Sequence, residues 1–422
     1  MIVGLGVSAA AGAFAALPEP ATGMPVSFEA NQSMATGQMH RQPRDRSDRS
    51  IEDYSAALEQ AESRNGAYGV ELIEPLQAIA TALQSGARYA AAIEYYQRAI
   101  HLTRVISGLY APAQVPLLKR LAASQNALGL YLQANETRDY LYRVQRHTMP
   151  ALDTGFSQAA LAHAQWKQQM YLHGAGGQGF LNLLESHQIH SRAVDAIAME
   201  DDNNPALIPH LYGRMTTEYL ISRYEGERDP QGLSFTQGYT GSANLEAEQF
   251  RLLRKYNFRN GRRTLLQVVK ILEQQQPLDA QALAKAKVAL GDWYLWWFQR
   301  ARALESYEAA YRIWADGIDH RLAPAELFGE PVKLPAGQSL PASFTAMVSQ
   351  ESARARVRFR VSRHGEARAI EVLDVQAPSD RDQQAARVVV HKMLRTSRFR
   401  PVVREGKVVM AEPIEREYRF DY

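Results

Sequence analysis

Two short stretches contain residue types that could bind a phosphate or a metal. The glycines of "HGAGGQGF" (His173 to Phe180) resemble those of a phosphate loop, but the Lys-Ser/Thr pair of a P-loop is absent. The stretch follows a helical pattern rather than a strand, so we interpret it as a loop between helices. His187 and His190 could supply two metal ligands, but no Glu follows in metalloprotease order. With no Gly-x-Ser-x-Gly elbow either, we expect no catalytic residue, no metal and no cofactor.

The composition is that of a soluble globular protein with two or three domains. Of the 422 residues, 46% are hydrophobic and 22% are charged. Cysteine is absent, which excludes disulfides, thiolate metal sites and thiol catalysis. The net charge of +3 is too small to imply a polyanionic partner. Residues 354–422 alone carry 16 Lys and Arg against 10 Asp and Glu, which marks this part of the chain as a separate unit.

The first 17 residues, "MIVGLGVSAAAGAFAAL", are mostly small and apolar. A membrane helix needs roughly 20 apolar residues, so this run is short for a span. It is typical of a signal peptide, with a cleavage site at Ala13-Phe14-Ala15. No Lys or Arg precedes Arg41, although such a signal normally begins with one. We expect export, with an uncleaved inner-membrane anchor as the alternative.

The region from Ile51 to Ala315 is predicted to be helical throughout, because apolar residues recur at spacings of three and four. Its last helices carry a Leu-Gly pair at Leu290 and Gly291 and place further small and aromatic residues at Tyr294, Ala303, Tyr307 and Ala310. Earlier in the region, a shift of 42 residues maps Tyr89 onto Tyr131 and Ala92 onto Ala134. Small residues allow two helices to cross closely, and the aromatic residue fills the gap to the next pair.

These spacings resemble the tetratricopeptide repeat (TPR) family. The resemblance implies a solenoid of about four to six helix pairs, with a concave groove that binds peptides. A non-repetitive helical bundle is the alternative, and residues 174–244 fit the repeat least well. Three of the five Trp residues lie in "DWYLWWF". If the alignment holds, the solenoid residues that bind a peptide are Lys119, Asn126, Lys285, Asp292 and Trp296; plain packing is the alternative for the Trp cluster.

The C-terminal residues predict a small domain of order β-β-α-β-β. "RVRFRV" alternates Val and Phe with Arg, as in a half-buried strand, and "ARAIEVLDV" forms a hairpin with it. A short helix begins near Asp380. "RFRPVVREGKVV" is then a strand, a turn at Glu405-Gly406 and another strand, with Pro401 at an edge or bulge. We expect Arg398, Arg400 and Arg404 to form the solvated face of this hairpin.

About 70 residues of this tail resemble the C-terminal domain of the TonB energy-transducer family. The shared features are Val-x-Phe-x-Val before a His-Gly turn, then Ile-x-Val-Leu, an Ala-rich helix and Phe399-Arg400-Pro401 before the Gly406 turn. The family domain lies in the periplasm and binds receptor segments as an added strand. The candidate residues on the last strand are Glu417, Tyr418, Arg419 and Phe420. The family's long Pro-Lys/Pro-Glu spacer is absent.

Five segments result: residues 1–17 (signal peptide or anchor), 18–50 (disordered linker), 51–315 (TPR-like solenoid), 316–350 (Pro-rich linker) and 351–422 (TonB-like domain). The predicted function is that of a periplasmic, non-enzymatic scaffold that binds a protein or peptide and an envelope partner such as an outer-membrane receptor. One alternative is a TonB-like energy transducer. Another is a cell-wall hydrolase with its site in residues 174–244. Nucleic acid is not expected, since Glu415, Glu417 and Asp421 share the outer face of the last strand.

Overall fold

The computed structural model describes residues 42–150, 153–174, 179–224, 242–317, 325–335 and 352–421. These residues fall into two compact units, one that extends to Ala196 and one that begins at Ile197 and includes the C-terminal strands. The boundary lies within helix α7 (Gly179–Ala198) rather than between the helices and the strands. The signal-peptide prediction and residues 18–41 of the predicted linker lie outside the described residues.

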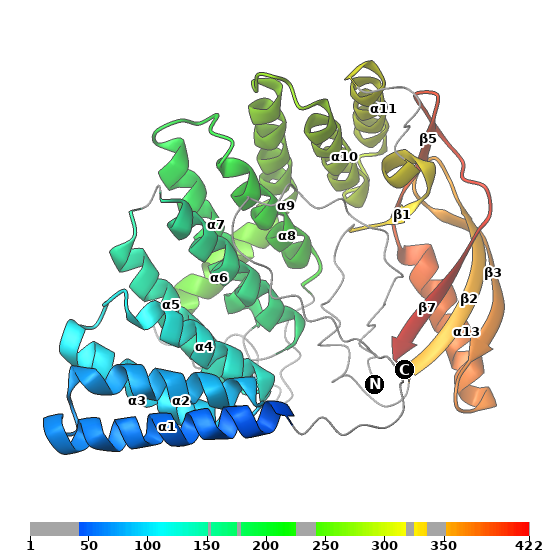
Figure 1. Cartoon of the computed structure of the whole chain (residues 1–422). Helices are drawn as coiled ribbons and strands as arrows, with labels where there is room; N and C mark the ends of the chain where they lie inside the picture. Colours follow the sequence, from blue (N-terminus) through cyan, green and yellow to red (C-terminus); the bar gives the residue numbers. More distant parts are fainter. Residues whose placement is uncertain are drawn as a thin grey trace. The chain divides into compact units, whose positions relative to one another are not determined.

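The first unit is built from helices that pack against their neighbours in sequence (Figure 1). In order they are α1 (Gln42–Asn65), the 3-10 turn η1 (Val70–Leu72), α2 (Ile73–Ser85), α3 (Tyr89–Ser107), α4 (Gln114–Ala127), α5 (Tyr131–Thr148), α6 (Thr154–Leu172) and α7. Helix α1 begins at Gln42, so the last part of the segment expected to be a disordered linker is helical.

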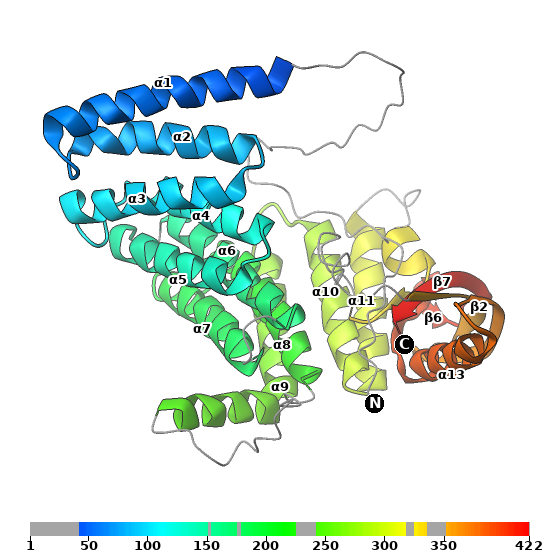
Figure 2. The same ribbon diagram turned by 90° about the horizontal axis from the view of Figure 1, so that it is seen from below.

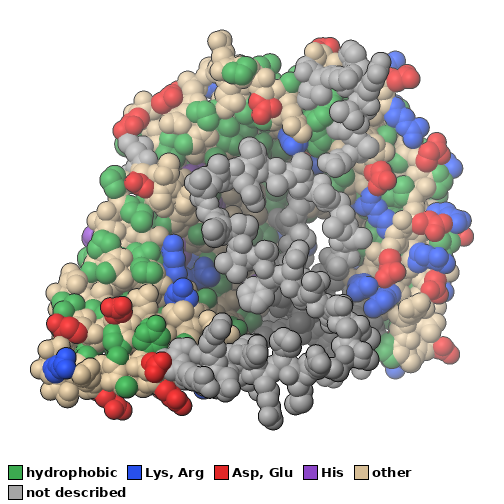
Figure 3. Space-filling view, viewed as in Figure 1, with side chains coloured by type: hydrophobic (Ala, Val, Ile, Leu, Met, Phe, Trp, Pro, Cys, Tyr) green, Lys and Arg blue, Asp and Glu red, His purple; other side chains and the backbone are tan. Residues whose placement is uncertain are grey.

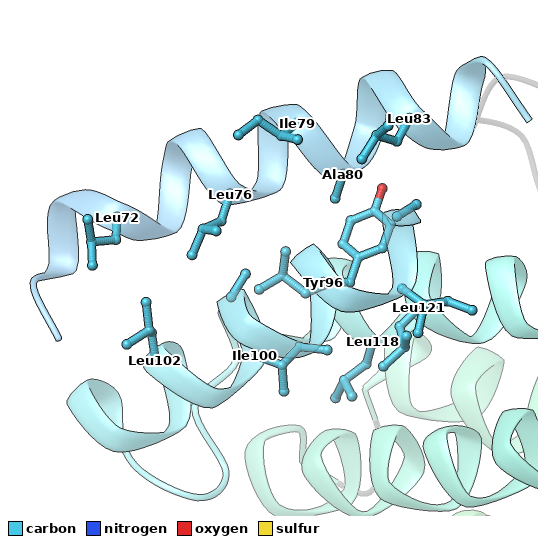
Figure 4. Close-up of a cluster of buried hydrophobic side chains, with 14 of the residues drawn as sticks. Leu72, Leu76, Ile79, Ala80, Leu83, Tyr96, Ile100, Leu102, Leu118 and Leu121 are labelled. Atoms are coloured by element: carbon cyan, nitrogen blue, oxygen red, sulfur yellow. The ribbon is translucent and has the colours of Figure 1, made fainter. Parts of the chain in front are cut away.

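The repeat predicted from small and aromatic residues is visible in the packing of α2, α3 and α4. Figure 4 shows the Tyr96 ring of α3 beside Ala80 of α2, with Leu118 and Leu121 of α4 on its other side. All these side chains are buried. Tyr89 and Tyr131, which the 42-residue shift relates, are the first residues of α3 and α5. The shift therefore describes a real helix-pair repeat.

The second unit begins with the helices α8 (Leu207–Ser222), α9 (Ser242–Glu273), α10 (Ala280–Trp296) and α11 (Arg300–Gly317). The last two form the pair for which the repeat spacing is clearest. A Cβ atom on Gly291 would lie 2.5 Å from Cε1 of Tyr307, so only glycine allows this approach of the two helices. Among the described residues, contacts join α2 with α3, α4 with α5, α8 with α9 and α10 with α11, and α6 and α7 share a cluster of buried side chains; a small strand-containing region follows these five helix pairs.

The C-terminal region contains an antiparallel sheet of order β3-β2-β7 and two shorter strand pairs. Its elements are η2 (Ala325–Gly329), β1 (Val332–Lys333), β2 (Ser352–Val361), β3 (Ala367–Gln376), α13 (Asp380–Thr396), β4 (Phe399–Arg400), β5 (Val402–Arg404), β6 (Lys407–Val409) and β7 (Ile414–Asp421). Helix α13 lies along one face of the sheet (Figure 2), and its buried side chains share a core with β2. Ser379 caps its first turn by accepting from the backbone N–H of Asp382.

The alternating pattern of β2 sorts its residues between this core and solvent. Val357, Phe359 and Val361 are buried, whereas Arg358 is exposed and pairs with Glu415 of β7 at 2.6 Å. Figure 3 shows basic and acidic side chains interspersed over the C-terminal strands. The arginines of β2 are therefore the solvated side of a mixed-charge sheet.

The turn between β5 and β6 confirms the hairpin predicted around Glu405-Gly406. Both residues have positive φ angles, +50° and +77°, as a two-residue type I′ turn requires. Pro401 separates β4 from β5. By contrast, described residues of the 316–350 segment do not form a spacer. Phe328 is buried, and β1 pairs with β4 through Val332 opposite Arg400.

Candidate functional site

A buried polar contact of the second unit joins β4 to helix α10. Arg400 donates from Nε to Asp292 Oδ1 at 2.9 Å and from Nη2 to Oδ2 at 2.6 Å. This two-bond geometry is the strongest form of the Arg–carboxylate pair. Tyr307 donates its hydroxyl to the same Oδ1 at 2.9 Å. Arg400 and Asp292 are only 2% and 4% exposed, so the pair serves the fold rather than an external ligand.

The electrostatics of this contact keep Asp292 surrounded by donors. Burial, and then the negative charge of Asp292, raise the pKa values of Tyr307 and Tyr219 well above 10, so both hydroxyls stay protonated. Burial alone would lower the pKa of Arg400, but the Coulombic attraction and hydrogen bonds of Asp292 outweigh it and raise the pKa. The guanidinium therefore remains charged.

The structure differs from our predictions for Arg400, Asp292 and Trp296. Arg400, expected on the solvated face of the hairpin, is buried because β4 lies against α10 and η2, where its Nη1 also approaches the Leu327 carbonyl at 3.5 Å. Asp292, expected to face a peptide groove, is satisfied internally. Trp296 is half-buried and donates from Nε1 to Ser222 Oγ at 2.9 Å. This hydrogen bond joins α10 to α8, so the side chain connects two helices within the unit.

Other contacts fix the β2–β3 turn to the same helix pair. Gly365 has φ +75°, and a Cβ atom there would lie 2.4 Å from the Phe399 carbonyl and 2.7 Å from Leu295 Cδ2. Beside this turn, Glu366 accepts from Arg300 of α11 at 2.5 Å. The C-terminal strands are thus docked on α10 and α11, and the second unit forms a single body.

The remaining solenoid candidates are divided between the two units. Lys119 is exposed and Asn126 half-buried on α4 of the first unit, whereas the half-buried Lys285 lies on α10 of the second. In the first unit an open groove of about 670 Å³ follows α2 between α1 and α4. It is lined mainly by side chains of α2, with Tyr54 of α1, Val70 of η1 and Arg120 of α4. α2 and α4 are the first helices of their pairs, so the groove lies on the side of the first unit that these first helices form.

A second polar cluster, which sequence reasoning missed, joins α5, α6 and α7 of the first unit. Lys167 is 3% exposed, and its Nζ forms ion pairs with Asp139 Oδ1 (2.7 Å) and Glu185 Oε2 (2.8 Å) and donates a hydrogen bond to Asn135 Oδ1 (3.0 Å). Two carboxylates and one amide oxygen therefore surround the buried ammonium group. The signal was present in the sequence, because Lys167 and His163 lie four residues apart on a helix face that is otherwise apolar.

His163 beside this cluster is held neutral. Its Nε2 lies 3.3 Å from Asp139 Oδ1, a contact that would favour protonation. Burial, and then the positive charges of Lys167 and Arg138, lower its pKa to about 3. Burial and the two cations outweigh the carboxylate, because Lys167 lies closer to that oxygen than His163 does.

The four candidates on the last strand lie on β7, at an edge of the sheet. Glu417 and Arg419 are exposed, whereas Tyr418 points into the core, where burial raises its pKa to about 12. The side chain of Phe420 lies outside the described residues, although its backbone pairs with Ala353 of β2. Within the described part of the chain, β7 pairs with β2 alone, so its outer backbone groups face no further strand.

Two classes of site are absent from the part of the chain that the structure describes. No group of three or more His, Asp and Glu side chains converges as metal ligands would. Within these ranges, no helix combines the length and apolar character that crossing a bilayer demands.

Comparison with known proteins gives a likeness of fold only. No family model and no curated protein matches the chain. A kinesin light chain-like protein of Podosopora anserina with nearly identical TPR-like repeats is 12% identical to this chain (TM-score 0.33), and the match covers 51% of this chain and 90% of that chain. A second structure of such a protein from the same organism is 13% identical (TM-score 0.31), and the match covers 51% of this chain and 94% of that chain. BtubC (BKLC) from P. vanneervenii shares 12% over 65% and 93% (TM-score 0.33). TM-scores this low do not establish the fold. The evidence for helix-pair repeats in this chain is the packing of its own helices.

Proposed function

We propose that the chain is a periplasmic, non-enzymatic protein-binding scaffold with a TonB-like C-terminal region. Its helix pairs bind one protein or peptide, and β7 docks an envelope partner, such as an outer-membrane receptor, as an added strand. The observation that carries the proposal is the outer edge of β7, which meets no strand among the described residues.

An edge strand of this kind presents unpaired N–H and C=O groups to any extended segment that reaches it. Main-chain hydrogen bonds would supply most of the affinity, and side-chain contacts the choice of partner. Glu417 and Arg419 project from the exposed side of β7 with opposite charges, so they favour a segment with complementary charges at alternate positions.

The docking of the C-terminal region on α10 and α11 supports a scaffold rather than a tethered, swinging module. The Asp292–Arg400 pair and the close approach at Gly365 hold the sheet against the last helix pair. A partner bound at β7 is therefore held in a fixed orientation to these helices. The groove along α2 provides the second surface that a scaffold needs.

The test uses a photoreactive amino acid at the edge strand. Replacing Arg419 with benzoylphenylalanine should yield a covalent adduct with an envelope protein on irradiation of intact cells, because side chains of neighbouring strands lie within about 5 Å. The same replacement of the exposed Arg404, on the separate β5–β6 pair, is the control and should yield none. Adducts at both positions, or at neither, would contradict strand addition at β7.

A further inference from the structure

A groove lies between helix α13 and strand β3, at the edge of the sheet opposite β7. It encloses about 640 Å³. Val372 of β3 forms one wall, and the exposed face of α13 supplies Arg387, Val388, His391, Lys392, Arg395 and Thr396. The groove is distinct from the β7 edge, since β2 separates the two strands.

The charged residues that line this groove, Arg387, Lys392 and Arg395, are all basic. Arg387, His391 and Arg395 follow one another at intervals of four, so they form a single row on α13. Lys392 lies beside the row. Among the residues that the structure describes, none of these side chains pairs with a carboxylate, and Arg387 donates only to the Val372 carbonyl at 3.3 Å.

The row adds little to the stability of the fold beyond the Arg387 hydrogen bond and the favourable position of Arg395 in the last turn of α13. Like charges at spacings of four weaken a helix slightly, whereas alternating charges would strengthen it. Elsewhere in the C-terminal region some arginines meet carboxylates, as Arg358 does with both Glu371 and Glu415. The groove beside α13 has no acidic residue in its lining, and this concentration of cations suits an anionic ligand.

The groove also has an apolar part. Val388 is 61% exposed at the middle of the basic row, and Val372 is half-buried opposite it. A free phosphate or a purely ionic ligand would leave these two side chains in water. A ligand that presents carboxylates on either side of one apolar side chain would cover them and meet the cations at once.

From this geometry we propose that the α13–β3 groove is a second docking site, which takes an acidic peptide segment with an apolar residue among its carboxylates. The carboxylates pair with Arg387, Lys392 and Arg395, and the apolar side chain packs between Val372 and Val388. A nucleic acid fits less well, because Asp380 and Asp382 at the start of α13 would meet a long polyanion with repulsion. The site does not depend on strand addition at β7.

The test measures fluorescence anisotropy of the full chain with a labelled peptide in which one Leu is flanked by Asp and Glu. We expect saturable binding that weakens with added salt. The charge-reversed variant Arg387→Glu/Arg395→Glu should lose affinity by about tenfold or more, because each lost surface pair is replaced by a repulsion. The control Arg381→Glu, an exposed position on the same helix outside the groove, should bind normally.

The apolar part of the groove has its own readout. Val388→Ala should lower the affinity for the Leu-containing peptide. The affinity for a peptide with Gly in place of Leu should not change. An equal effect of Arg381→Glu and of the double reversal would overturn the proposal, since binding would then follow net charge alone. Tighter binding of a single-stranded oligonucleotide than of the peptide would overturn it as well.

Discussion

Replacing Arg400 by Met should strongly destabilise the second unit. The change removes both donors to Asp292, at 2.9 and 2.6 Å, and leaves the carboxylate with the Tyr307 hydroxyl alone. Asp292 remains buried against α11 and cannot be solvated in place of its lost partner. Met fills much of the volume of the Arg side chain, so the change isolates the charge and its hydrogen bonds.

The expected cost follows from the burial of the pair. Removing one partner of a buried ion pair typically costs about 3–5 kcal/mol, because an uncompensated charge is left in a poorly solvated place. An exposed arginine on the same hairpin should behave differently. Arg404→Met should change the free energy of unfolding by less than about 0.5 kcal/mol.

The assay is urea unfolding of the full chain followed by tryptophan fluorescence. Trp293 is fully buried on α10, next to Asp292 in sequence, so its emission reports on this unit. The double variant Arg400→Met/Asp292→Leu tests the cause, since replacing both charges by apolar side chains is often neutral. A loss below about 1 kcal/mol for Arg400→Met, or a double variant less stable than the single, would refute the reasoning.

Three further outcomes follow from the packing and the titrating groups. Gly365→Ala should destabilise the second unit by at least about 2 kcal/mol in the same assay, because the left-handed backbone and the approach to the Phe399 carbonyl both exclude a Cβ atom; a variant as stable as the parent would contradict this contact. His163 has a folded pKa of about 3 against 6.5 when unfolded, so the unfolded chain binds the extra proton and stability falls as pH drops below 6.5. The loss at pH 5 should be about 2 kcal/mol and should disappear in His163→Gln; an unchanged pH profile of that variant would exclude His163 as the cause. Lys167→Met should cost only about 1–2 kcal/mol, less than Arg400→Met, because its partners Asp139 and Glu185 are 35% and 48% exposed and can be hydrated; an equal or larger loss would contradict that difference.

The repeat and the hairpin were predictable because their signals are local. Small residues such as Gly291 and Ala92 are needed wherever two helices cross closely, and the aromatic Tyr307 fills the space beside them. Glu405-Gly406 specifies a two-residue turn through its own backbone preferences. In both cases the residues that interact are few positions apart or repeat at a constant interval.

The docking of the C-terminal region could not be predicted in the same way. Asp292 and Arg400 are 108 residues apart, and each pattern taken alone placed its charge toward solvent. Only the fold shows that β4 brings Arg400 onto α10. For the same reason the unit boundary was predicted after residue 315, whereas the compact units divide within α7.

Amide hydrogen exchange on β7 tests strand addition most directly. The partner cross-linked at position 419 would be purified and mixed with the unmodified full chain, and exchange would be followed in the peptide that covers Ile414–Asp421. We predict slower exchange in this segment on binding, since the free edge of β7 gains main-chain hydrogen bonds, and unchanged exchange in the β5–β6 hairpin. Unchanged exchange across Ile414–Asp421 in the complex would contradict the proposal that the partner binds as an added strand.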